Sequence, residues 1–96
     1  MAYDPGAIDA ALAAAVGDEP ALIAELRLAF VESAQRALAA MEAADGRDAW
    51  REAAARMKGL AASFGAVRLM ALAAQAADLP HDGAMLAKLR RSVARL

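Results

Sequence analysis

The amino-acid sequence predicts a single all-α domain over residues 1–96, an antiparallel up-down four-helix bundle with a short extra helix at the N-terminus. Three observations favour this fold. About a third of the residues are alanine, the strongest helix former. Apolar residues recur every three or four positions, and no segment alternates as a strand would. The connections between the apolar segments are short, which favours antiparallel neighbours.

The first two helices are predicted from their start signals. Asp4-Pro5 provides an N-cap and a proline at the first helical position, and Gly17 ends a short helix. Asp18-Glu19-Pro20 begins a much longer helix, with acids where the helix dipole favours them. The expected apolar stripes are Ile8, Leu12 and Val16 in the short helix, and Leu22, Ile23, Leu26, Phe30, Ala34, Ala37, Leu38 and Met41 in the long one.

Three further helices follow. Asp45-Gly46 is a turn dipeptide, Asp48 is expected to cap the third helix, and Gly65 is expected to end it. A loop is predicted at 79–83, between the fourth and the last helix. The expected buried stripes are Trp50, Ala53, Met57, Leu60 and Phe64, then Leu69, Leu72, Ala73, Ala76 and Leu79, and finally Leu86, Leu89, Val93 and Leu96.

Composition narrows the classes of protein. The 11 basic and 12 acidic residues are interspersed, which argues against nucleic acid or a membrane surface as partner. The absence of cysteine excludes disulfides and thiolate metal sites. No apolar run approaches the roughly 18 residues of a membrane span, and the N-terminus lacks signal-peptide features. A cytoplasmic protein is expected, and the wealth of Ala, Arg, Asp and Gly favours a bacterial source.

The chain offers few groups for catalysis. His81 is the only histidine and lies in the predicted 79–83 loop, where a solvated side chain is expected. As a metal ligand it has only Asp78 and Asp82 nearby, too few for a specific site. Ser63 is expected to bond to the local backbone. With no catalytic triad and no phosphate-binding loop, we expect no enzyme activity, no cofactor and no metal.

The third predicted helix carries the most specific motif. Its segment 54–59 reads Ala-Ala-Arg-Met-Lys-Gly, and Ser63-Phe64-Gly65-Ala66 and Leu69 follow it. This pattern resembles the signature of histidine-containing phosphotransfer (HPt) domains, which reads Ala-His-x-Leu-Lys-Gly, a spacer and then Gly-Ala-x-x-Leu. The resemblance extends from about Leu22 to the C-terminus. Position 55, where that family has its phosphorylated histidine, is Ala55.

Helix geometry places position 55 on the outer face. At about 100° per residue, Ala55 lies about 160° from Met57, the centre of the buried stripe. On this outer face it is joined by Arg51, Lys58, Gly59 and Ala62. Lys58 and Gly59 also have a simple explanation, a solvated lysine and a glycine that permits a close helix contact. The cost of glycine argues against this simple explanation. Glycine inside a helix is less stable than alanine by roughly 1 kcal/mol, and this chain uses alanine almost everywhere else.

The resemblance implies a surface for docking signalling partners. In the HPt family a receiver domain docks around the histidine, the lysine stabilises the phosphoryl charge and the glycine gives the partner clearance. A glutamine that many members place on the next helix is Ala77 here, and Gln75 lies about 200° around the helix from it. We therefore expect a pseudo-HPt adaptor that binds a receiver domain or a histidine kinase and carries no phosphate. The expected binding residues are Ala55, Lys58, Gly59, Ala62, Arg51, Arg56, Ala66 and Met70, with Val67 and Met70 beside Ala62 and Ala66 in a mildly apolar surface.

Two alternatives stay open. The chain is also consistent with a working HPt domain whose histidine has been replaced by Ala55. It is equally consistent with a helical interaction or oligomerisation module, unrelated to phosphorelay, that uses another alanine-rich face. A monomer is expected in either of the phosphorelay interpretations.

Overall fold

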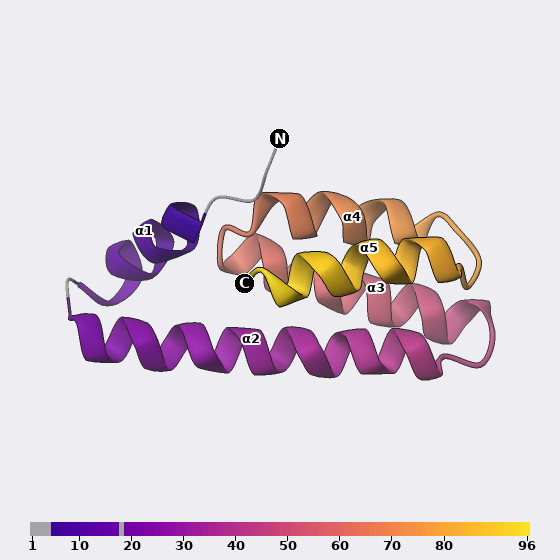
Figure 1. Ribbon diagram of the computed structural model, residues 1–96, viewed down its shortest axis with the longest axis horizontal. Helices are drawn as coiled ribbons and strands as arrows, with labels where there is room; N and C mark the ends of the chain where they lie inside the picture. Colours follow the sequence, from indigo (N-terminus) through magenta and orange to yellow (C-terminus); the bar gives the residue numbers. More distant parts are fainter. Residues whose placement is uncertain (1–4, 18) are drawn as a thin grey trace.

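The computed structural model describes residues 5–17 and 19–96 (Figure 1). Within these ranges the chain forms helices and no strand, which confirms the all-α prediction. The helices are α1 (Pro5–Val16), α2 (Pro20–Ala43), α3 (Arg47–Ser63), α4 (Val67–Ala77) and α5 (Gly83–Ala94). The caps expected at Asp4 and Asp18 lie outside the described residues, as do the side chains of Ile8 and Val16.

Helices α2 to α5 lie lengthwise beside one another, and the chain reverses direction at each turn between them (Figure 1). α3 packs against α2 and α4, and α5 packs against α4 and α2. Among the described residues α1 packs against α2. α3 and α5 therefore lie diagonally across the group and do not contact each other. None of the described helices combines the length and apolar character needed to span a bilayer.

Glycines mark the turns as the sequence predicts. Gly17 and Gly65 follow α1 and α3 with φ of 82° and 73°, a left-handed conformation that strains other residues. The expected helix ends at these two glycines are confirmed. The expected cap at Asp48 is wrong, because α3 begins at Arg47 and its N-cap residue is Gly46. Asp48 lies instead in the first turn, where a carboxylate still favours the helix dipole.

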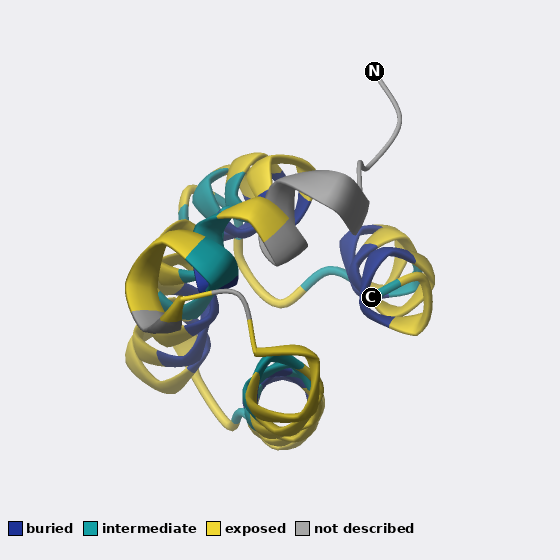
Figure 2. Cartoon of the chain, turned by 90° about the vertical axis from the view of Figure 1, so that its left-hand side faces the viewer, coloured by how far each residue is buried: buried dark blue, intermediate teal, exposed yellow. Residues whose placement is uncertain are grey.

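The core lies between α2, α3, α4 and α5 and combines a few large side chains with many alanines (Figure 2). The largest fully buried side chains are Trp50, Phe30, Met41, Met57, Leu69 and Leu89. Alanines with no exposed surface lie among them, at Ala34, Ala37, Ala54, Ala61, Ala66, Ala73 and Ala76. Small side chains let helix axes approach closely, so the larger residues can fill the remaining space.

The stripe predicted for α2 is buried only in its second half. Leu22 is 36% exposed, and Ile23 and Leu26 are half-buried, whereas each stripe position from Phe30 onward is buried. The reason is length, because α2 has 24 residues and α3 has 17. The first turns of α2 extend beyond the other long helices and have only α1 beside them (Figure 1).

Polar contacts join helices that are distant in sequence. The Trp50 indole N–H on α3 donates to the Ala76 carbonyl in the last turn of α4, at 2.8 Å. That carbonyl also accepts the Leu79 N–H at 3.1 Å, so the buried indole is a second donor to a group at the end of α4. At the C-terminal end of α2, the Arg90 guanidinium on α5 donates to the Glu42 carboxylate at 2.8 Å.

Candidate functional site

The motif residues lie on the exposed side of α3. Ala55 is exposed, whereas Ala54 and Met57 on the same helix have no exposed surface. The predicted position of residue 55 on the outer face is therefore confirmed. The residues that share this face, and that are named here the α3 outer surface, are Arg51, Ala55, Lys58, Gly59 and Ala62, all of them exposed.

Gly59 has no structural reason to be glycine within the described chain. A Cβ atom built on it would meet no heavy atom within 4 Å, and its φ is not positive. The explanation that Gly59 permits a close helix contact is therefore wrong. Its carbonyl accepts a hydrogen bond from the Ser63 hydroxyl at 2.9 Å, which confirms the predicted local bond of that serine.

Lys58 presents a positive charge beside this bare segment of backbone. Its side chain is exposed and forms no hydrogen bond or ion pair with any described residue. The same holds for Arg51, about two turns earlier on the same flank of α3. The α3 outer surface thus combines two unpaired cations with three residues no larger than alanine. Asp48 and Glu52 are exposed about 20° around the helix from Ala55 and Gly59, so negative charge lies beside it.

Met70 is the predicted site residue that α4 contributes. The Trp50–Ala76 bond sets the antiparallel register of α3 and α4, and Met70 lies six residues before Ala76. Met70 therefore lies close to the level of Lys58. Its side chain is half-buried and packs against the core, so only part of it is exposed.

Ala66 does not belong to the surface that the sequence predicted. It has no exposed area, and its N–H donates to the Ala61 carbonyl at 2.9 Å, where the chain leaves α3 and enters α4. The tight α3–α4 turn draws this residue into the core. Its neighbour Val67 is 64% exposed and takes the outward position instead.

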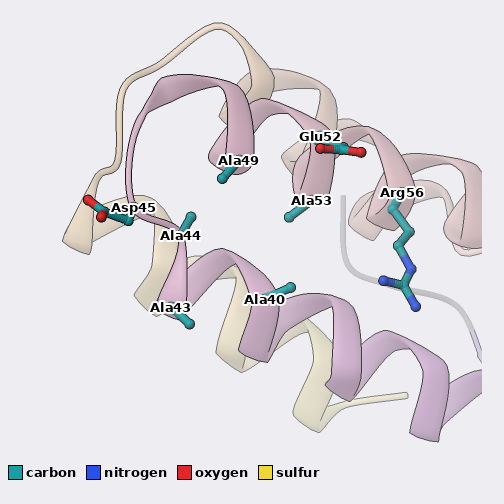
Figure 3. A pocket seen from close by; sticks show the side chains of 8 residues that line it. All are labelled: Ala40, Ala43, Ala44, Asp45, Ala49, Glu52, Ala53 and Arg56. Carbon is teal, nitrogen blue, oxygen red and sulfur yellow. The ribbon is translucent and has the colours of Figure 1, made fainter.

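Arg56 is also separated from the α3 outer surface. It lies about 200° around the helix from Lys58, which directs it to the opposite flank of α3. There it lines an open groove of about 560 Å³ between α3 and the C-terminal part of α2 (Figure 3). The groove is lined by Ala40, Ala43, Ala44, Asp45, Ala49, Glu52, Ala53 and Arg56, and is named here the α2–α3 groove.

The sequence analysis did not find the α2–α3 groove. A signal for it exists, because Ala40 and Ala43 on α2 and Ala49 and Ala53 on α3 lie on flanks that an antiparallel pairing turns toward each other. Facing alanines are too short to fill the space between two helices. The pairing itself, however, is a tertiary feature that the periodicity of either helix alone does not show.

His81 lies in the α4–α5 turn at one end of the molecule. Its side chain is exposed, as expected, but its ring also packs against the Trp50 ring with centroids 4.8 Å apart. The ring Nε2 lies 3.4 Å from the Glu42 carbonyl. The prediction of a purely solvated loop side chain is therefore incomplete. No described residue supplies His81 with a lysine neighbour comparable to the one beside Ala55.

The positions that would support a phosphorylated histidine differ as well. Ala77, at the place of the glutamine in the HPt pattern, is half-buried and packs against the core. Gln75 is exposed on another side of α4. No family model, curated protein or solved structure matches the chain. The motif and the geometry of the α3 outer surface are therefore the grounds for a functional proposal.

Proposed function

We propose that the chain is a pseudo-HPt domain, a four-helix bundle with an added N-terminal helix that binds a receiver domain or a histidine kinase without carrying phosphate. The cyclic packing of α2, α3, α4 and α5 supports the bundle topology. The proposal implies the bacterial cytoplasm as its setting, since the partners of a two-component phosphorelay operate there.

Gly59 is the observation that carries the proposal. Glycine in the middle of an exposed helix face costs roughly 1 kcal/mol of stability relative to alanine. No heavy atom lies within 4 Å of a Cβ atom built on Gly59, so no contact within the protein requires glycine there. A partner that approaches the backbone closely would require it. Clearance for a partner is the role that the HPt resemblance implies for this glycine, beside Lys58 and Ala55.

The chemistry of position 55 decides between carrier and adaptor. A phosphoryl carrier needs a nucleophilic side chain in solvent, and Ala55 offers only a methyl group. Lys58 remains next to it without an ion-pair partner among the described residues. Its ammonium can therefore face the acidic pocket of a receiver domain. Binding is retained in this arrangement, whereas transfer is lost.

A labelling experiment tests the loss of transfer. Incubation with a phosphorylated receiver domain or an active histidine kinase should leave this protein unlabelled, because Ala55 cannot form a phosphoramidate bond. The measurement is radiolabelled phosphate on the protein after separation from the donor. Stable label on His81 would contradict the proposal, and substitution of His81 by glutamine would identify that site.

A substitution in the α3 outer surface tests the binding. Gly59→Glu adds bulk and negative charge where the partner is proposed to approach, and should abolish receiver binding in a titration calorimetry experiment. The matched control is Ala24→Glu, which adds the same charge at an exposed position in the first turns of α2, which extend beyond α3 (Figure 1).

Circular dichroism should show equal helicity for both variants. Binding that survives Gly59→Glu unchanged would rule out this docking face.

A further inference from the structure

The α2–α3 groove lies between α3 and the C-terminal part of α2, and none of its lining residues belongs to the α3 outer surface. We infer that this groove binds α5 of a second copy of the chain. The interaction is a weak, head-to-tail self-association governed by charge. It is independent of phosphorelay, so it stands or falls separately from the proposed function.

An acidic stripe runs along the rim of the groove. Asp48 and Glu52 lie one turn apart on α3, and Asp45 precedes them in the turn between α2 and α3. All three are exposed, and none forms a hydrogen bond or ion pair with a described residue. Asp45 and Glu52 line the groove, at its turn end and along its α3 edge (Figure 3), and Asp48 lies beside Glu52 toward the outer side of α3.

A basic stripe of the same spacing runs along α5. Lys88, Arg91 and Arg95 are three and four residues apart, exposed, and without a partner among the described residues. The segment 83–96 contains no acidic residue at all. Arg90, the remaining cation of α5, points to the other flank and is occupied by Glu42.

The two stripes do not meet within one molecule. The backbones of α3 and α5 do not approach each other, and none of these acids pairs with any of these cations. Unpaired charges of opposite sign and matching spacing favour association between copies. Because two different surfaces are used, the contact is head-to-tail and does not close by itself into a symmetric dimer.

The shapes of the two surfaces also match. The outward side of α5 carries Ala84 and Ala94 around Arg91, so the helix presents small side chains between its cations. A ridge of this kind fits a groove with an alanine floor, because small residues on both sides allow close approach of the helix axes. The long side chains of Lys88 and Arg95 reach the rim while their aliphatic parts stay on the groove.

An antiparallel arrangement of α5 from one copy against α3 of the other brings opposite charges together. It places the C-terminal end of α5, with its negative dipole end, beside the positive N-terminal end of α3. Asp48 then lies level with Arg91, and Glu52 with Lys88. Continuing the same register places Arg56 level with Ala84, so the one cation of the groove meets no like charge.

Charge-reversed pairs of variants test this self-association. Asp48→Lys/Glu52→Lys makes both surfaces basic, and Lys88→Glu/Arg91→Glu makes both acidic. Sedimentation equilibrium at low ionic strength and about 1 mM protein should show association of the parent chain, weakened by salt of about 0.5 M as charges are screened. Each variant alone should bind itself at least about tenfold more weakly, because like charges then face each other.

The decisive sample is an equimolar mixture of the two variants. Both of its mixed contacts are complementary, so association should return to at least the parent level. The control Glu25→Lys/Glu32→Lys changes the net charge equally on exposed positions of α2 and should associate like the parent.

Circular dichroism should show that each variant is folded. The neutral variant Asp48→Asn/Glu52→Gln gives a milder version of the same loss. A mixture that stays monomeric, or reversed variants that self-associate like the parent, would overturn the inference.

Discussion

The inner and outer faces of α3 both carry very small side chains, for opposite reasons. On the inner face, Ala54 and Ala61 have no exposed surface, since α4 and α2 leave room for nothing larger. On the outer face, Ala55, Gly59 and Ala62 are exposed, and a Cβ atom on Gly59 would meet nothing. Small size is explained by the fold on one side only. On the other side it points to a contact outside the chain.

The two faces also differ in how firmly they are held. The inner face is anchored by Trp50, fully buried and bonded to the Ala76 carbonyl at 2.8 Å. On the outer face Lys58 forms no contact of this kind with a described residue. The inner face therefore sets the stability of the domain, and the outer face is open to recognition. Three substitutions can break or sharpen this contrast.

The largest effect is expected at the anchor of the inner face. Trp50→Ala removes a fully buried aromatic side chain and should cost about 3–5 kcal/mol of unfolding free energy. Urea denaturation followed by circular dichroism measures it. Trp50→Phe is the control, which keeps most of the volume and should cost clearly less. A loss below about 1 kcal/mol in Trp50→Ala would contradict the contrast between the faces.

A smaller effect separates two adjacent alanines. Ala54→Leu forces a larger side chain into the packed α3 interface and should cost about 1–3 kcal/mol. Ala55→Leu places the same side chain in solvent and should change the stability by less than about 0.5 kcal/mol. The two variants have the same composition, so thermal unfolding compares them directly. Equal losses would show that residue 55 is packed as tightly as residue 54.

The smallest effect has the opposite sign. Gly59→Ala should stabilise the domain by about 1 kcal/mol, because the helix gains a better former and the added methyl group meets nothing. Gly65→Ala, the control, should destabilise it, since φ at Gly65 is 73°. Guanidinium denaturation midpoints report both signs. A destabilising Gly59→Ala would show that this glycine serves the fold after all.

Much of the fold was readable from local signals. The turn at Asp45-Gly46, the start at Pro20 and the stop at Gly65 were predicted from residues that act on their own backbone. The all-helical class followed from the period of apolar residues. The exception among local signals is Asp48, because the N-cap of α3 is Gly46, two residues earlier.

The candidate site was predictable only for those features that depend on the geometry of a single helix. The angular positions of Ala55, Lys58 and Gly59 follow from 100° steps and agree with their exposure. Ala66 was misplaced because its burial depends on how the α3–α4 turn folds back. Arg56 was grouped with Lys58 although α2 occupies its flank.

The sequence by itself determined which segments are helical and which side of each is apolar, because both depend on interactions a few residues apart. The tertiary structure alone decided which flanks face each other, and with them the α2–α3 groove, the contact of His81 with Trp50 and the open space at Gly59. These features arise between residues distant in sequence. Their distances are set by the packing of whole helices, which no single periodicity encodes.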